Sequence, residues 1–200
     1  MPTETKLILG TVLAVLVVSG IGPHDYLTWV LETFPVMAGV VAIVWTYRRF
    51  PLTPLLLRLL ALHALVLAVG GHYTYAQVPL GFWVQDLLDL SRNHYDRLGH
   101  VMQGFVPAIL VRELLLRTSP LGHSRWLSVL SVSVCLAFSA FYELIEWWSA
   151  LILSQGADSF LGTQGDPWDT QWDMFLALCG AIASLLLLSR LHDRQLSRLG

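Results

Sequence analysis

The sequence predicts an all-α, polytopic membrane protein, a bundle of six transmembrane helices with both termini in the cytoplasm. Hydrophobic residues make up 55% of the chain, charged residues 13%, and the mean hydropathy is +0.61. These values lie outside the range of soluble globular domains. Apolar segments of about 20 residues recur along the chain, and basic residues gather on one side of them. The net charge of −2 does not indicate nucleic acid as a partner.

The apolar segments lie at residues 7–22, 27–47, 55–76, 98–116, 126–153 and 172–191, and we expect them to form a single membrane domain over residues 1–200. The first segment is the weakest, because it is short and is followed by Gly22 and Pro23. Lys6 before an apolar run also fits a cleavable signal peptide. No convincing small-x-small cleavage site follows the run, so we expect a membrane span there.

Basic residues orient the predicted bundle. With the N-terminus in the cytoplasm, all but Arg92 and Arg97 of the 12 lysine and arginine residues fall on the cytoplasmic side. This asymmetry follows the positive-inside rule. The eight tryptophans lie near the predicted segment ends, as expected for indoles in the headgroup layer.

This topology gathers the notable polar residues at the outer end of the bundle. They are His72, Asp86, Asp89, His94, Asp96, His100, Gln103, Glu143, Glu146, Asp158, Asp166, Asp169 and Asp173. Asp96 and His100 are four residues apart and Glu143 and Glu146 are three apart, so each pair shares one helix face. A carboxylate in hydrocarbon costs ~2.5–3.5 kcal/mol on insertion scales. Glu143 and Glu146 therefore need a proton, an arginine or a metal ion.

The segment LGTQGDPWDTQWDM joins the last two predicted helices. Its glycines and Asp166-Pro167 favour a turn, and we expect the last helix to be capped by Thr170 or Asp169. Asp166 and Asp169 fit an Asx turn and a helix cap as well as they fit a site. Asp173, one turn inside the helix, is the better candidate for a site shared with His100 and Glu146.

Histidine and carboxylate side chains together suit a divalent ion such as Zn²⁺, Mn²⁺ or Fe²⁺. An ion with an open coordination position would lower the pKa of bound water for attack on an ester, amide or phosphoester. The predicted ligands are His94, His100, Glu143 and Asp173. Asp96 would orient a histidine, and Glu146 would be the general base. Arg97, together with Arg92, is either a counter-ion of the carboxylates or a clamp for an anionic headgroup.

The same residues also fit a polar network without metal. His94 and Asp96 would then belong to a hydrated loop, and Arg97 would pair with Asp96 or with a glutamate. A protonated Glu143 would hydrogen-bond to Tyr142 or Tyr95. Both interpretations stay open, because the sequence has no motif as specific as HExxH.

Three further patterns concern the interior of the bundle. Glu32 and His63 lie near or within hydrocarbon, where we expect each to find a partner on a neighbouring helix. The small residues of CGAIAS, residues 179–184, predict close helix approach. The inner halves of the last three segments are nearly free of ionisable groups, which argues against a polar path across the membrane.

Three motifs resemble the YjdF-like family of small bacterial inner-membrane proteins, a domain of unknown function: NHYDRLGHVMQGFVPAILVRELLLR, SAFYELIEWW and GTQGDPWDTQWDMFLALCGA. The resemblance covers residues 75–188 and implies an inner-membrane protein whose motif residues form the functional region. Those residues are His94, Asp96, Arg97, His100, Gly104, Arg112, Glu113, Glu143, Glu146, Gly165, Asp166, Trp168, Asp169 and Asp173. A Glu-x-x-Glu helix followed by an Asp-initiated helix with Gly180 is similar, more faintly, to the VanZ-like family.

Two functional classes follow. In the first, the protein is a metal-dependent hydrolase or transferase at the outer leaflet, acting on a lipid or an envelope precursor. In the second, it is a non-enzymatic accessory subunit or transporter-like module whose polar cluster is a structural network. A stable complex with another membrane protein, or a polar path from His100 to the cytoplasmic side, would favour the second class. Membrane lipids are expected partners in both.

Overall fold

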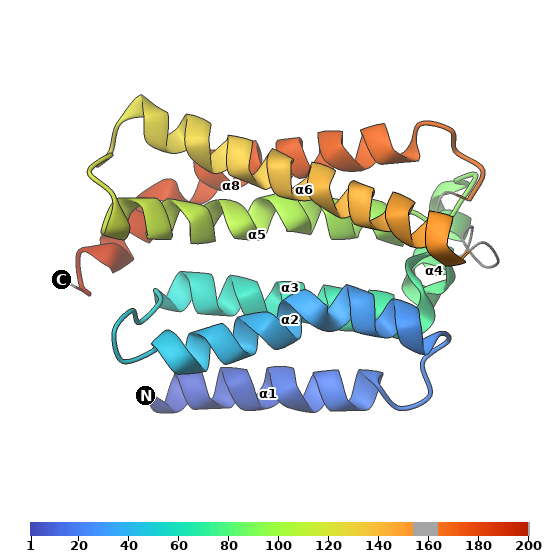
Figure 1. Ribbon diagram of the computed structural model, residues 1–200, viewed down its shortest axis with the longest axis horizontal. Coiled ribbons are helices and arrows are strands. Elements are labelled where there is room, and N and C mark those ends of the chain that lie inside the picture. Colours follow the sequence, from blue (N-terminus) through green and yellow to red (C-terminus); the bar gives the residue numbers. More distant parts are fainter. Residues whose placement is uncertain (154–163, 200) are drawn as a thin grey trace.

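The computed structural model describes residues 1–153 and 164–199, which form a bundle of α-helices (Figure 1). The helices are α1 (Thr3–Ser19), α2 (Tyr26–Thr46), α3 (Pro54–Tyr73), α4 (Pro79–Leu88), α5 (Tyr95–Thr118), α6 (Arg125–Leu153) and α8 (Asp169–Leu196), with the 3-10 helix η1 (Tyr75–Gln77) between α3 and α4. No β-strand occurs in these two ranges. The predicted all-α class is confirmed, and a long helix overlaps each predicted apolar segment.

Five helices of the described ranges, α2, α3, α5, α6 and α8, are long and apolar enough to cross a membrane. The helix α1 is not among them. Its 17 residues give a length of roughly 26 Å, slightly less than the ~30 Å of the hydrocarbon core. A sixth span therefore stays a prediction.

The two ends of the bundle differ in charge. At one end α1 begins and α8 ends (Figure 1); we call it the basic end, because it carries the arginines that follow α2 and those that end α5 and α8. At the opposite end α2, α5 and α8 begin. We call it the acidic end, because Glu32, Asp96, Asp169 and Asp173 lie within the first two turns of these helices.

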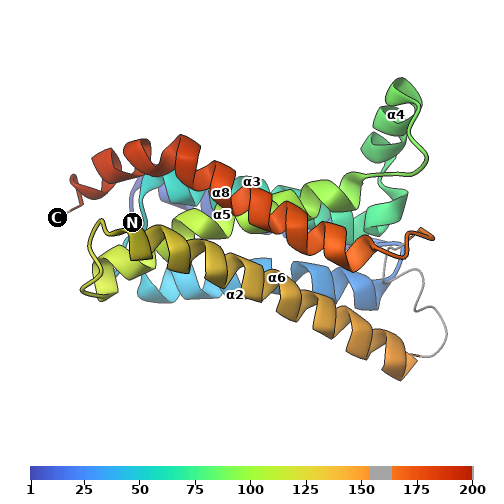
Figure 2. The ribbon, with the colours of Figure 1, turned by 90° about the horizontal axis from the view of Figure 1, so that it is seen from above.

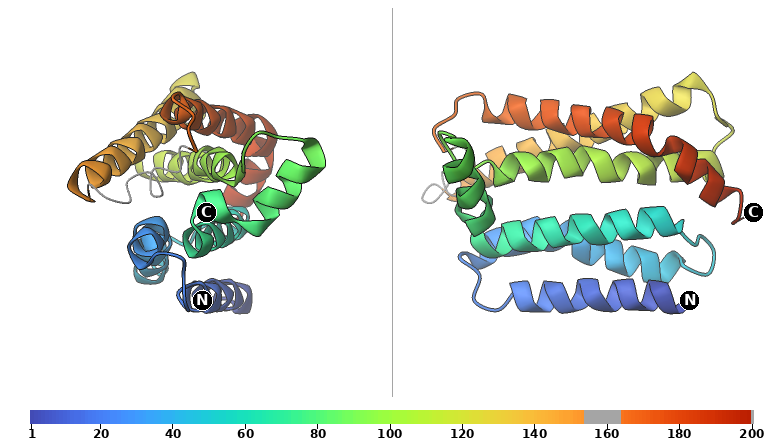
Figure 3. Two further views of the ribbon diagram at one scale, coloured as in Figure 1. Left: turned by 90° about the vertical axis from the view of Figure 1, so that its right-hand side faces the viewer. Right: turned by 180° about the vertical axis from the view of Figure 1, so that it is seen from behind.

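The helix α5 is the centre of the bundle. It packs against α8, α6 and α3, and α3 packs in turn against α1 and α2. The end-on view of Figure 3 shows α5 between α3 and the pair formed by α6 and α8. At the acidic end α4 projects from the bundle (Figure 2), and its Trp83 and Leu87 are exposed. The sequence did not predict α4, because ten residues are too few to form an apolar segment of spanning length.

The closest helix contact joins α5 and α8, which run in the same direction. Gly104 lies against the backbone carbonyl of Ala177, and Gly180 lies against that of Val101. A Cβ atom at either glycine would collide with these backbone atoms. The predicted close approach through residues 179–184 is confirmed at Gly180, and it follows the small-residue packing common between membrane helices.

A buried ionic network joins α3, α5 and α8 at the basic end. Glu113 is fully buried, and its carboxylate accepts hydrogen bonds from the side chains of Thr53 (2.7 Å), Arg117 (2.8 Å) and His192 (2.9 Å). Arg112 donates to Nδ1 of His192 (2.9 Å), so the ring donates its Nε2 proton to Glu113. The prediction that the inner halves are nearly free of ionisable groups was wrong for the ends of α5 and α8.

Replacing Gly104 with alanine is expected to destabilise the protein by about 1–3 kcal/mol, the usual cost of overpacking. The added methyl group meets the backbone of α8, which cannot rotate away as a side chain can. Thermal unfolding in detergent measures the effect. Gly10→Ala is the matched control, because its Cβ would have nothing within 4 Å; equal stability of the two variants would contradict the packing described for α5 and α8.

Replacing Glu113 with alanine is expected to cost about 3–5 kcal/mol, because it leaves buried cationic and donor groups without their acceptor. Glu4→Ala removes a carboxylate from the exposed pair with Arg58 and is expected to cost about 0–1 kcal/mol. Chemical unfolding of the two variants beside the wild type compares them. A Glu113 variant as stable as the Glu4 variant would show that the buried network contributes nothing to the fold.

Candidate functional site

The start of α5 places two polar side chains on one helix face. Asn93 fixes this start: its side chain accepts a hydrogen bond from the backbone N–H of Tyr95 and donates one to the carbonyl of Val78 (3.0 Å each). Asp96 and His100 then follow four residues apart, with 3.6 Å between Asp96 Oδ1 and His100 Nε2. The predicted shared face is confirmed.

The helix α8 brings a second carboxylate to the same nitrogen. Asp173 Oδ2 lies 3.8 Å from His100 Nε2. Asp96, His100 and Asp173 each place one ligand atom within 4.8 Å of the other two. Among the described residues, this is the one group of three or more His, Cys, Asp or Glu side chains close enough to share a metal ion. His100 and Asp173 are 7% and 3% exposed, so both side chains are withdrawn from solvent and lipid.

Two separations within this group are close to those of a small divalent ion site. Two ligand atoms at about 2.0–2.1 Å from a tetrahedral zinc ion lie roughly 3.4 Å apart. The two contacts of His100 Nε2, 3.6 Å and 3.8 Å, are close to that spacing and too long for hydrogen bonds. In the part of the chain that the structure describes, Asp173 Oδ1 is buried and has no hydrogen-bond partner.

The other imidazole nitrogen faces two different side chains. Nδ1 of His100 lies 3.0 Å from Gln103 Oε1, which accepts the Nδ1 proton in the tautomer that leaves Nε2 free to bind a metal. Glu143 Oε1 lies 3.9 Å from the same Nδ1. Glu143 was predicted as a ligand and Asp96 as the residue that orients a histidine, whereas the structure places Asp96 on the Nε2 side and Glu143 on the Nδ1 side.

The arginines pair with the aspartates at the start of α8. Arg92 donates to Asp169 (2.7 Å), and Arg97 donates to Asp166 (3.0 Å) while its guanidinium lies 5.4 Å from the ring centre of Trp172. Of the two predicted roles, counter-ion or clamp, these contacts agree with the counter-ion. The predicted pairing of Arg97 with Asp96 or a glutamate is not what the structure shows.

The segment before α8 forms the predicted Asx turn, in which Asp166 accepts a hydrogen bond from the backbone N–H of Trp168 (2.9 Å). The predicted N-cap at Thr170 or Asp169 was wrong. Trp168 occupies that position without a side-chain cap, and Asp169 is the first residue of the helix and pairs with Arg92. Asp158, also predicted for this end, lies outside the described residues.

His94 does not join Asp96, His100 and Asp173. It is the N-cap residue of α5, where the chain has not yet entered the helix and the side chain is not in register with His100. Burial, followed by the positive charges of Arg97 and Arg92, lowers the pKa of His94 from its usual value. Its Nδ1 is buried and makes no hydrogen bond with a described residue.

Glu146 lies in the outer wall of the site, where it lines one cavity together with Asp96 and His100. The alternative in which a tyrosine hydrogen-bonds to Glu143 is not found. Tyr142 donates to Glu32 of α2 (2.9 Å), and Tyr95 donates to the carbonyl of Val66 (3.0 Å). The expected partner of Glu32 on a neighbouring helix is therefore confirmed.

Gln103 was predicted at this end of the bundle without a role, and Asn93 and Tyr75 were not predicted there. Gln103 belongs to the same helix face as His100, since the two are three residues apart, and that spacing was the available signal. For Asn93 and Tyr75 the sequence offered no such signal, because their positions depend on α4 and η1. Tyr75 packs against Gly70 and Gly99, both of which lack the Cβ atom that would exclude its ring.

Comparisons with known proteins agree with this architecture. Residues 5–194 match a family described as "Predicted membrane protein (DUF2238)". The inner membrane protein YjdF of Escherichia coli K12 is 55% identical over 190 residues, which cover 95% of this chain and 91% of that protein. No solved structure matches. The fainter similarity to VanZ-like proteins stays a prediction.

Proposed function

The chain belongs to the DUF2238 family of predicted membrane proteins and is a multi-pass inner-membrane protein, and from this premise we propose that it is a membrane enzyme. Asp96, His100 and Asp173 hold a divalent ion, Zn²⁺, Mn²⁺ or Fe²⁺, in a hydrolase or transferase that acts on a lipid or an envelope precursor. The observation that carries the proposal is the convergence of these three ligand atoms within 4.8 Å.

The proposed topology has six spans, with α1 as the first, and both termini in the cytoplasm. The positive-inside rule assigns the basic end to the cytoplasmic side. The common location of the start of α1 and the end of α8 supports an even number of crossings (Figure 1). In this topology the acidic end, with the site, faces the outer leaflet.

Each residue of the site has a role in the proposal. The ion supplies a water of lowered pKa for attack on the substrate. Gln103 orients the imidazole of His100 from its Nδ1 side, as partners of metal-bound histidines commonly do. Glu143 lies 3.9 Å from the same nitrogen and places a carboxylate beside the ring. Glu146 is the general base, because it lines the same cavity as two of the ligands. Arg97 positions the start of α8 through Asp166.

A non-enzymatic accessory module is the second candidate. The ion pairs of Arg92 with Asp169 and of Arg97 with Asp166 favour it, because they connect the starts of α5 and α8 without any metal. In this candidate the acidic end is a structural network that presents α4 and the adjoining turns to another membrane protein. The two candidates differ in one measurable property, which is bound metal.

Purified protein is expected to contain stoichiometric metal by elemental mass spectrometry. His100→Ala and Asp173→Asn are expected to lose it, because each removes one of three ligands. His94→Ala and His123→Ala are the controls: His94 lies outside the ligand group and His123 is an exposed histidine. Metal absent from the wild type after loading, or retained in both ligand variants, would reject the proposed function in favour of the accessory module.

Gln103→Leu is expected to weaken metal affinity about 10–100-fold, the usual cost of losing a side chain that orients a metal-bound histidine. The ligands themselves stay in place. Competition with a chelator of known affinity measures the change, and Gln77→Leu, an exposed glutamine of η1, is the control. Equal affinities of the two variants would mean that Nδ1 of His100 needs no acceptor.

A further inference from the structure

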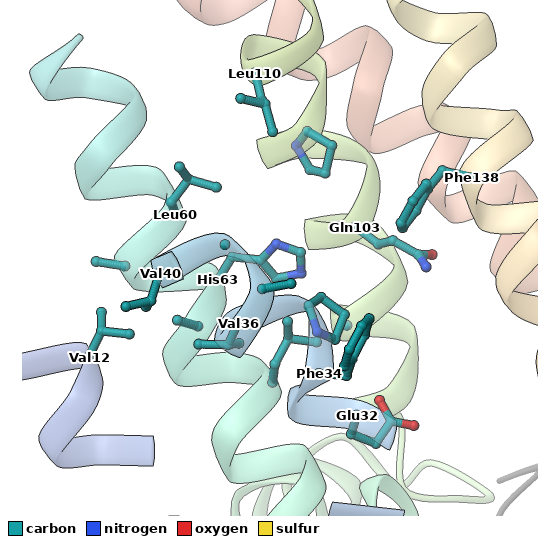
Figure 4. Close-up of a pocket in the computed structure, with 18 of the residues that line it drawn as sticks. Val12, Glu32, Phe34, Val36, Val40, Leu60, His63, Gln103, Leu110 and Phe138 are labelled. Atoms are coloured by element: carbon teal, nitrogen blue, oxygen red, sulfur yellow. The ribbon is translucent and has the colours of Figure 1, made fainter. Parts of the chain in front are cut away.

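A cavity of about 560 Å³ lies between α1, α2 and α3 on one side and α5 and α6 on the other (Figure 4). We call it the chamber. Its volume is within the range of small-molecule sites. Aliphatic side chains from all five helices form most of its wall, among them Val12, Val36, Leu60, Leu110 and Val134.

The chamber is long. Along α5 its lining residues run from Asp96 to Val111, a distance of roughly 22 Å at 1.5 Å per residue. The hydrocarbon of one leaflet is half of the ~30 Å core, or about 15 Å. The chamber can therefore accommodate the full length of a hydrocarbon chain from one leaflet.

At the acidic end the wall becomes polar. The lining residues there are Glu32, Tyr75, Asp96, His100, Tyr142 and Glu146. Tyr142 donates its one hydroxyl proton to Glu32. A carboxylate can accept several hydrogen bonds, so the carboxylates at this end can accept more hydrogen bonds than the tyrosines can donate. A head group that carries hydroxyl donors complements these acceptors, whereas in the metal-free protein an anionic head group meets carboxylates of like charge.

Away from that end the chamber is almost entirely apolar. Beyond Gln103, His63 is the one polar side chain that lines it among the described residues, and its Nε2 has no hydrogen-bond partner there. The expected partner of His63 on a neighbouring helix is thus not found. An ion gives up its hydration shell where polar groups replace it, and this part of the chamber offers almost none. This wall suits a hydrocarbon chain instead.

Two exposed side chains of the chamber wall indicate an opening toward lipid between α2 and α6. Phe34 on α2 and Phe138 on α6 both line it and are 63% and 53% exposed. Figure 4 shows these two aromatic rings on different helices beside the cavity. At the acidic end the hydrogen bond between Tyr142 and Glu32 joins α2 to α6. A chain in the bilayer can therefore enter sideways, past the phenylalanines, without crossing the polar end.

We propose that the chamber binds the hydrocarbon chain of a bilayer lipid, which enters between α2 and α6 and places a hydroxyl-bearing head group beside Glu32, Asp96 and His100. In making this lipid the substrate of the metal site, the proposal rests on the proposed function. Binding of the chain does not depend on the ion, because the two ligands that line the chamber, Asp96 and His100, lie at its polar end and the apolar wall contains none.

The probe is a monoacylglycerol whose chain carries a photoactivatable diazirine, mixed into phosphatidylcholine vesicles that contain the full-length protein. After illumination, mass spectrometry of peptides locates the label. Labelling is expected on residues that line the chamber on α3 and α5. Labels confined to residues outside the chamber wall would overturn the proposal.

Two glycine variants test whether the labelled site is the chamber. Gly39 lines it, and a Cβ atom there would have nothing within 4 Å, so Gly39→Trp fills the chamber without a backbone collision. Gly10→Trp on the exposed side of α1 is the matched control. We expect at least a tenfold loss of chamber labelling in Gly39→Trp, as when an indole displaces about two methylene groups. Equal labelling in both variants would overturn the proposal.

One further comparison separates chain binding from metal binding, and a second tests the head group. Asp173 does not line the chamber, so Asp173→Asn is expected to lose metal and to keep chain labelling; loss of labelling there would overturn metal-independent binding. In protein stripped of metal with a chelator, a fatty acid probe of the same chain length is expected to label less than the monoacylglycerol at neutral pH. Equal or stronger labelling by the fatty acid would overturn the assignment of the head group.

Discussion

The backbone contact between α5 and α8 positions the polar clusters at both ends of the molecule. Gly104 and Gly180 lack the side chains that would hold the helices apart. Because the helices are parallel and meet in one register, Asp173 faces His100 at the acidic end and His192 faces Glu113 at the basic end. His100 and Glu113 are roughly 20 Å apart along α5. A shift of one residue would rotate α8 by about 100° and separate both pairs.

The buried ionic groups also favour one register of α8 against α5. Buried pairs add little net stability over apolar packing, since desolvation opposes the attraction. They penalise arrangements in which a charge has no partner far more strongly. Glu113 accepts hydrogen bonds from residues of α5 and α8 and from Thr53 at the start of α3, so any sliding of α8 takes the His192 donor away from a buried carboxylate. The apolar surfaces of these helices alone would allow such sliding.

Much of this could be predicted from local patterns, and the exceptions depend on contacts between distant segments. The long helices followed from apolar segment length, and Asp96 with His100 followed from helical spacing. Asp96 lies beside Nε2 of His100 and Glu143 beside Nδ1, the reverse of what their predicted roles required. This arrangement depends on how α6 is rotated against α5, which no spacing within α6 specifies. His94 lies outside the group of Asp96, His100 and Asp173, because it precedes the helix, which begins at Tyr95. Glu32 joins the polar groups of this end through its hydrogen bond with Tyr142, a contact between residues 110 positions apart in the chain.

The opening between α2 and α6 also determines which concentration of a lipid ligand sets the occupancy of the chamber. Phe34 and Phe138 face hydrocarbon, so a lipid that passes between them moves within the plane of the membrane and never dissolves in water. Its occupancy of the chamber then depends on its mole fraction among the surrounding lipids. Adding buffer to a suspension of vesicles leaves that fraction unchanged, whereas adding an inert lipid to the bilayer lowers it. The membrane composition, and not the bulk volume, sets the working concentration of the site.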